Sequence, residues 1–216
     1  MVFSILTLFP EVFKPIFSSS IIGRAQRKKQ ITIRLINIRH FASDSHHTVD
    51  DAPYGGGTGM LLKINVLYEA LQSAKIKKSK ERIILLDPTG DLFNHSKALQ
   101  MTKFDHLILI CGHYEGVDYR INHFIDEKLS IGRYILTGGE IPAMVVSDVV
   151  TRLLPGVLKK EQAVRDESFS EGENLEFPQF TRPEKYRGHN VPPILLSGNH
   201  QKIAQWRQKE ARKRSL

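Results

Sequence analysis

The chain has 216 residues, of which 41% are apolar and 25% are charged, and its formal net charge is +8 with the histidines neutral. This composition is typical of a folded protein with a sizeable core, and it excludes collagen, low-complexity chains and disulfide scaffolds. The single cysteine, Cys111, cannot form an internal disulfide and fits a reducing compartment.

The first ten residues are apolar but carry no basic segment, and Pro10 and Glu11 end the run. We therefore expect a buried strand here rather than a signal peptide. No stretch approaches 18 uninterrupted apolar residues, so we expect no membrane span and a cytoplasmic location.

Five short apolar runs, rich in β-branched residues and bounded by turn residues, predict strands. In chain order they are residues 2–9, 31–38, 82–87, 106–111 and 133–137. Two helical patterns lie among them, at residues 63–75 and 140–154, and Pro155-Gly156 ends the second. The expected buried faces are Val66, Leu67, Ala70, Leu71 and Ala74 in the first helix, and Met144, Val145, Val149 and Leu153 in the second. Strands that alternate with helices predict an α/β fold with a mainly parallel sheet, covered on both faces.

The C-terminal part of the chain has a different composition. Residues 159–176 include six acids and few apolar side chains, which predicts a mobile acidic linker. Residues 177–216 carry nine basic residues against two acids, with a helical stretch at 203–214. We therefore predict a domain over 1–158, the linker, and a small, mostly helical basic domain over 177–216. The basic charge favours a polyanion partner, with Arg207, Arg212 and Lys213 as phosphate contacts, although a solvated basic helix would look the same.

Glycine-rich turns follow three of the predicted strands: DPTG at 87–90, CGHYEG at 111–116 and TGGE at 137–140. In open parallel sheets, ligands bind beyond the carboxyl ends of the strands. Three such loops at one edge could enclose a nucleoside-like ligand. Taken singly, each loop is better explained as a tight turn between a strand and a helix, whereas the three together favour a ligand site.

Two further motifs resemble known sites only in part. YGGGTGM at 54–60 lacks the Gly-Lys-Ser/Thr end of a phosphate-binding loop, so we expect a flexible loop that faces the substrate. HHTVDD at 46–51 has no paired metal-ligand spacing, so we expect no metal site there, and polar contacts to substrate or backbone instead. Arg152, at the end of the second helix, could serve as a helix-end cation or as a donor to an anionic group.

Longer strings throughout the chain resemble the bacterial tRNA (guanine-N1)-methyltransferases of the SPOUT superfamily. They include LFPEVF (8–13), TVDDAPYGGGTGM (48–60), CGHYEGVDYRI (111–121), SIGRYILTGGEIPAM (130–144), RLLPGVL (152–158), ESFSEG (167–172), FPQFTRPEKYRG (177–188) and VPPILLSGNH (191–200). The resemblance implies a C-terminal trefoil knot in the α/β domain. It also implies a homodimer that binds S-adenosylmethionine and tRNA and methylates N1 of guanine 37, 3′ of the anticodon. Magnesium dependence is a property of that family for which no ligand cluster is visible here.

The resemblance also assigns roles to residues. The cofactor pocket would be formed by Leu86, Pro88, Gly112, Ile131, Gly132, Arg133, Tyr134, Ile135, Leu136, Gly138 and Gly139. Glu115 matches the carboxylate that recognises the guanine edge, and Arg152 matches the arginine that stabilises the guanine oxygen. Glu167 matches the general base, with Asp166 as the alternative. Two other functions stay open: a SPOUT methyltransferase for another RNA base, and a non-catalytic RNA-binding module.

Overall fold

The computed structural model describes residues 1–158, 168–169 and 174–215. The chain divides into two compact units, Met1–Leu158 and Lys159–Leu216, and each is described by itself. None of the described helices is long and apolar enough to cross a membrane.

The first unit is built on a five-stranded sheet in the order β2-β1-β6-β5-β7, and every pair of neighbours is parallel. The α/β class and the parallel sheet predicted from the sequence are therefore confirmed. The strands of this sheet are β1 (Val2–Thr7), β2 (Thr32–Asn37), β5 (Glu81–Leu92), β6 (His106–Cys111) and β7 (Glu127–Ser130), and a small second ladder joins β3 (Asp50–Asp51) to β4 (Leu61–Leu62).

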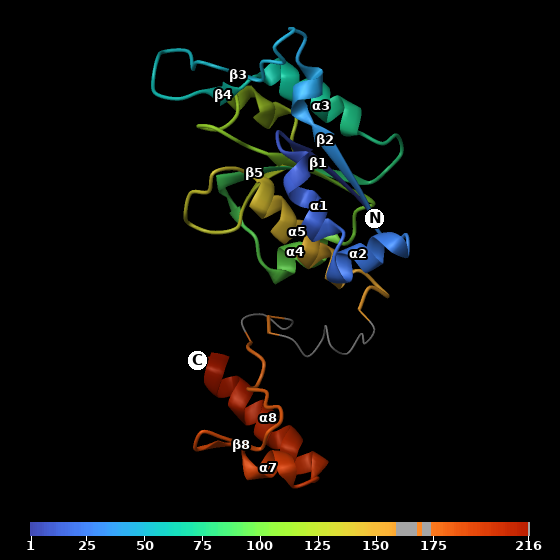
Figure 1. Cartoon of the computed structure of the whole chain (residues 1–216), viewed down its shortest axis with the longest axis vertical. Coiled ribbons are helices and arrows are strands. Elements are labelled where there is room, and N and C mark those ends of the chain that lie inside the picture. The colour runs from blue at the N-terminus through green and yellow to red at the C-terminus, as the bar shows by residue number, and fades with distance from the viewer. Residues whose placement is uncertain (159–167, 170–173, 216) are drawn as a thin grey trace. The chain divides into compact units, whose positions relative to one another are not determined.

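Helices cover both faces of the sheet (Figure 1). They are α1 (Lys14–Phe17), α2 (Ser20–Arg27), α3 (Ile64–Ala74), α4 (His95–Met101) and α5 (Glu140–Leu153), with short 3-10 turns η1 (Pro10–Phe13), η2 (Ile38–Phe41) and η3 (Tyr119–His123). Strand β6 shows how its side chains divide between the two layers. Leu107 and Leu109 face the core that α1, α2, α4 and α5 complete, whereas Ile108 and Ile110 face the core under α3. All five residues of the expected α3 face are buried.

Several local predictions are wrong. Residues 133–137 are not a strand but part of a loop, and the missing strand is β7, just before them. The DPTG turn lies within β5, where a register shift between Leu86 and Asp91 accommodates it as a bulge. The fully buried face of α5 includes Ala143, Val146 and Val150. Of the predicted face, Met144, Val149 and Leu153 are partly buried and pack against this core, whereas Val145 is exposed.

The second unit contains a hairpin of β8 (Lys185–Tyr186) and β9 (His189–Asn190), followed by α7 (Pro193–Leu196) and α8 (His200–Ser215). The predicted helix at 203–214 lies within α8. Trp206 packs its ring 6.4 Å from that of Phe180, which ties α8 to the segment that precedes the hairpin. Of the predicted linker 159–176, residues 159–167 and 170–173 lie outside the described part of the chain.

Candidate active site

A pocket of about 380 Å³ lies beside the bulge in the middle of β5 and at the carboxyl ends of β6 and β7. It is lined by residues 85–89, 112–117, 129–132 and 134–139, together with Pro142 at the start of α5. This volume lies in the range of sites that hold drug-sized ligands or cofactors. The three glycine-rich turns noted in the sequence therefore meet at one pocket.

Ten of the eleven residues predicted to hold a cofactor line this pocket, and the exception is Arg133. They are Leu86, Pro88, Gly112, Ile131, Gly132, Tyr134, Ile135, Leu136, Gly138 and Gly139. Arg133 is exposed and stands outside the lining. The role of all eleven residues in cofactor binding stays a prediction.

The loop of residues 131–139 is held against the end of β6 by backbone contacts. It is the yellow segment that leads into α5 in Figure 1. The N–H of Gly139 donates to the carbonyl of Gly112 at 2.8 Å, and His113 and Gly138 form an isolated antiparallel bridge. A Cβ atom on Gly139 would lie 2.6 Å from Cα of Cys111, so only glycine allows the two backbones to approach this closely.

Side-chain hydrogen bonds to its own backbone also hold this loop in place. The Ser130 hydroxyl donates to the carbonyl of Gly132 at 2.9 Å, and the Tyr134 hydroxyl donates to the carbonyl of Ile131 at 3.3 Å. The Ser130 carbonyl in turn accepts the N–H of Phe93 at 2.7 Å, which fastens the end of β7 to the end of β5. These hydrogen bonds fix the backbone of the pocket wall.

A buried polar group beneath the pocket was not found from the sequence. Glu140, the first residue of α5, is 9% exposed, and its Oε1 accepts a hydrogen bond from the Thr7 hydroxyl at 2.7 Å. Burial, reinforced by this nearby carboxylate, raises the pKa of the Cys111 thiol well above its ordinary value, so the thiol is neutral. Within the described residues, Nδ1 of His113 is buried without a hydrogen-bond partner, which leaves a polar atom available at the pocket lining. The TGGE motif contained Glu140, but the sequence indicated only the start of a helix there.

Glu115 and the glycine loop at 54–60, which were singled out separately in the sequence, are neighbours in the structure. The N–H of Glu115 donates to the carbonyl of Met60 at 3.1 Å, and the Glu115 side chain lies directly against Gly59. Gly59 has a φ of +83°, and a Cβ there would lie 2.3 Å from Cγ of Glu115. The loop therefore positions an exposed carboxylate at the rim of the pocket.

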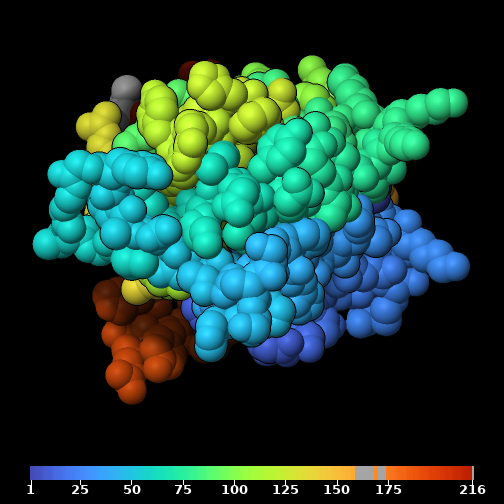
Figure 2. Space-filling view, turned by 90° about the horizontal axis from the view of Figure 1, so that it is seen from above, coloured from blue at the N-terminus to red at the C-terminus, as the bar shows by residue number. Residues whose placement is uncertain are grey.

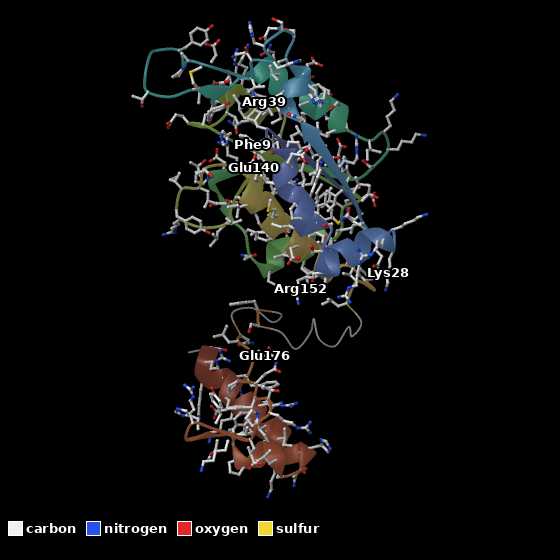
Figure 3. The ribbon with its side chains drawn as sticks, in the orientation of Figure 1. Phe9, Lys28, Arg39, Glu140, Arg152 and Glu176 are labelled. Carbon is white, nitrogen blue, oxygen red and sulfur yellow. The ribbon has the colours of Figure 1, made fainter. Side chains whose placement is uncertain are left out.

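The predicted catalytic residues do not all meet at this pocket within one chain. Arg152 lies in the last turn of α5, whereas the pocket is at the first turn; the ten residues from Pro142 to Arg152 span about 15 Å along the helix. Figure 3 shows Glu140 and Arg152 at opposite ends of this helix. Glu167 and Asp166 lie outside the described residues.

The predicted phosphate contacts of the second unit all lie on α8. The guanidinium of Arg207 lies 4.7 Å from the ring centroid of Phe177, and Nζ of Lys213 lies 2.6 Å from Oε1 of Glu210. Arg212 is exposed, and no ion pair joins it to another described residue.

The histidines of the 46–51 motif are exposed in a turn organised by Asp44. The side chain of Asp44 accepts hydrogen bonds from the hydroxyl and N–H of Thr48 and from the N–H of His46. Among the residues that the structure describes, no group of three or more His, Cys, Asp or Glu side chains is arranged to hold a metal ion.

Comparison with known proteins agrees with this architecture over the full length of the chain. The model of the family described as tRNA (Guanine-1)-methyltransferase TrmD matches residues 1–216. The chain belongs to this family. A tRNA (guanine-N(1)-)-methyltransferase of Dictyoglomus turgidum is 52% identical over 212 residues, which cover 98% of this chain and 85% of the relative. That of Geobacillus kaustophilus is 53% identical over 213 residues, covering 98% and 87%, and that of Staphylococcus aureus strain JH9 is 48% identical over 206 residues, covering 95% and 83%. The family resemblance seen in the sequence motifs is therefore confirmed.

Proposed function

We propose that this chain is a tRNA methyltransferase that transfers a methyl group from S-adenosylmethionine to N1 of guanine 37. The observation that carries the proposal is the convergence of three glycine-rich loops on one pocket, in a chain that matches the TrmD family from end to end. Relatives about half identical to this chain are named tRNA (guanine-N(1)-)-methyltransferases.

The pocket suits the proposed methyl donor. Its walls combine apolar side chains, such as Leu86, Ile135 and Leu136, with the glycines of the three loops and a few polar side chains, among them His113 and Glu115. Gly139 lies so close to the end of β6 that a Cβ atom there would overlap its backbone, so glycine is needed to hold the loop in this position. When bound there, S-adenosylmethionine supplies a methyl group already activated by its sulfonium, so the chain mainly has to position the two reactants.

The guanine must lose its N1 proton before that nitrogen can attack the methyl group. A carboxylate within hydrogen-bond reach can take the proton, and Glu167 or Asp166 has that role in this proposal. Negative charge then develops on the guanine oxygen, where the Arg152 guanidinium would stabilise it. Glu115 at the pocket rim would accept hydrogen bonds from the edge of the base.

The position of Arg152 supports a homodimer as the active form. Pro142 of α5 lines the pocket, and the ten residues from it to Arg152 span about 15 Å along the helix, too far for the pocket and Arg152 of one chain to act on one base. A second copy can bring its own Arg152 to the pocket of the first.

We further propose the SPOUT trefoil knot for the segment that forms the pocket loops. Magnesium use by this enzyme likewise rests on family membership alone.

Methyl transfer to paired tRNA transcripts tests the proposed function. The two transcripts differ only at position 37, with guanine in one and adenine in the other, and methylation is followed with a labelled donor. We expect labelling of the first transcript alone, at guanine N1. Equal labelling of both would indicate another target base, and binding of tRNA without any heat of S-adenosylmethionine binding would indicate a non-catalytic RNA-binding module.

A further inference from the structure

The end of the sheet at which the strands begin, opposite the pocket, carries eight exposed basic side chains that the proposed site does not use. They lie on the segments that lead into β2, β5 and β6. These residues are Arg27, Lys28, Lys29, Lys75, Lys77, Lys78, Lys80 and Lys103. Within the described residues, none of the eight forms an ion pair with an Asp or Glu side chain.

The sheet register places these segments side by side. Val2 is paired with Thr32 on one side and with His106 on the other, and His106 is paired with Glu81. The strands that follow the basic segments therefore begin at the same level, across three strand spacings of about 14 Å in total. In Figure 2, the blue segment around residues 27–30 and the green segment around 75–80 project from the same side of the molecule. We call these eight residues the basic edge.

Two acidic residues at this edge, Asp105 and Glu81, contact groups other than the eight basic side chains. Oδ2 of Asp105 accepts the N–H of Lys80 at 3.1 Å, and the partly buried Glu81 lies 3.6 Å from Nδ1 of His106. The carboxylates of Asp87 and Glu115, in contrast, lie around the pocket at the other end of the strands. The first unit is thus polarised, and its basic edge is available to an anionic partner.

Two of the lysines occupy backbone positions that favour glycine. Lys29 follows α2 with a φ of +58°, where the N–H of Gln30 donates to the carbonyl of Ala25 at 2.9 Å. This is the glycine position of a helix-ending Schellman motif. Lys78 has a φ of +63° in the turn that the Ser79 N–H closes onto Ile76. Lysine costs stability relative to glycine at both places.

We infer that the basic edge binds phosphates of the tRNA backbone, away from the target base. This inference rests on the proposed function, because that function supplies the polyanion. Exposed lysine ammonium groups on loops suit phosphate contacts, which position a nucleic acid without reading its bases. The six residues of β6 separate this edge from the pocket by about 20 Å, so the phosphates bound there belong to the body of the tRNA.

An anionic membrane is a poorer fit to the same charges. Amphipathic segments that lie in a membrane interface combine exposed apolar side chains with basic ones. The apolar residues on these segments, Ile76 and Phe104, are partly buried, and Phe104 packs beneath the ammonium group of Lys80 at 5.3 Å.

The test replaces four of these lysines and measures binding of full-length tRNA at several salt concentrations. The variant carries Lys28→Gln, Lys29→Gly, Lys77→Gln and Lys78→Gly, and the matched control has arginine at the same four positions. We expect the variant to bind tRNA about tenfold more weakly, with a slope of log K against log[salt] that is shallower by about 2–3, whereas the control keeps wild-type values. Both glycines relieve strained positions, so the midpoint of urea unfolding should not fall, and S-adenosylmethionine affinity should be unchanged.

Two outcomes would overturn the inference while leaving the proposed function intact. One is a variant whose tRNA affinity and salt slope equal those of the wild type. The other is an unchanged tRNA affinity with lysine-dependent binding of wild-type protein to phosphatidylserine vesicles, which would assign the edge to a membrane. If the wild-type protein itself neither binds nor methylates tRNA, the proposed function fails, and the inference fails with it.

Discussion

The hydroxyl of Thr7 bridges two segments that are 133 residues apart in the chain. It donates to Oε1 of Glu140 at 2.7 Å and accepts the N–H of Phe9 at 2.9 Å. The end of β1 is thereby joined to the first turn of α5, directly beneath the loop that lines the pocket. Figure 3 shows Phe9 and Glu140 close together in this region.

Loss of the Thr7 hydroxyl should destabilise the first unit. In Thr7→Val, the buried carboxylate of Glu140 and the N–H of Phe9 both lose a partner, at a cost of about 1–3 kcal/mol in the free energy of unfolding. Urea unfolding measures this change. Thr7→Ser keeps the hydroxyl and should stay within about 1 kcal/mol of the wild type. Equal losses in the two variants would show that the methyl group, and not the hydrogen bond, matters at this position.

An added methyl group at Gly139 should displace the pocket loop. In Gly139→Ala, the new Cβ would meet backbone atoms of Cys111 and Gly112 at 2.6 and 2.9 Å, and neither can move aside without shifting β6. We expect a loss of about 1–3 kcal/mol in stability and a weaker affinity for S-adenosylmethionine, measured by titration calorimetry. The control is Gly112→Ala, whose Cβ would have its nearest neighbour at 3.6 Å, so its unfolding free energy should be nearly unchanged. A Gly139→Ala protein with wild-type cofactor affinity would contradict this role.

The sequence predicts the sheet well where strands are apolar and poorly where the pocket is built. Residues 106–111 are apolar throughout and match β6 in full, because a strand buried on both faces needs a continuous apolar run. Residues 133–137 also include apolar and β-branched side chains, but they form a loop, and residues 134–137 line the pocket. The true strand, Glu127–Ser130, has four residues and two charges, so its pairing with β5 depends on tertiary context that no local pattern contains.

The candidate site likewise has features that the sequence indicates and features that it does not. The glycine turns indicated the pocket, because close backbone approach leaves a signature in the sequence. The contact between Thr7 and Glu140 leaves none, since it joins distant residues of common types. Small residues such as Ala143 and Ser147 are fully buried on α5, whereas a search for large apolar residues pointed to Met144 and Val149, which pack against the same core but are only partly buried.

His106 should make stability depend on pH. Its ring is fully buried, with Nε2 2.8 Å from the Ser4 hydroxyl. Burial lowers the pKa of His106 below 6.5; Glu81 opposes this shift and Arg34 adds to it. The unfolded chain therefore takes up a proton at a higher pH than the folded one. As the pH falls from about 6.5 toward the lower folded-state pKa, the free energy of unfolding should decrease.

Urea unfolding at pH 7.5 and at pH 5.5 measures this dependence. His106→Gln should lower stability at both values but reduce the difference between them. The exposed His40 provides the control, because His40→Gln should leave the pH dependence as in the wild type. A His106→Gln protein with an undiminished pH dependence would assign the effect to other groups.

Charge reversal on α8 should weaken tRNA binding through the second unit. Arg212→Glu changes an exposed charge only, so we expect weaker binding and a shallower salt slope with no loss of stability. Arg207→Glu also removes the guanidinium from the ring of Phe177, so it should reduce the stability of the second unit as well. Filter binding at several salt concentrations, with thermal unfolding alongside, separates the two effects. If neither substitution changes tRNA affinity, α8 is only a solvated basic helix.

Complementation between subunits should show whether Arg152 acts on the pocket of a second copy. Arg152→Ala removes the guanidinium, and Glu115→Ala removes the carboxylate at the pocket rim, so each homodimer should lose methyl transfer. Two differently tagged chains, co-expressed and purified as the heterodimer, combine one intact Glu115 with one intact Arg152 across the interface. Because a symmetric dimer has two sites, this heterodimer should recover about half of the wild-type activity. If Arg152 instead serves the pocket of its own chain, each of the two sites contains one substitution and the heterodimer stays inactive.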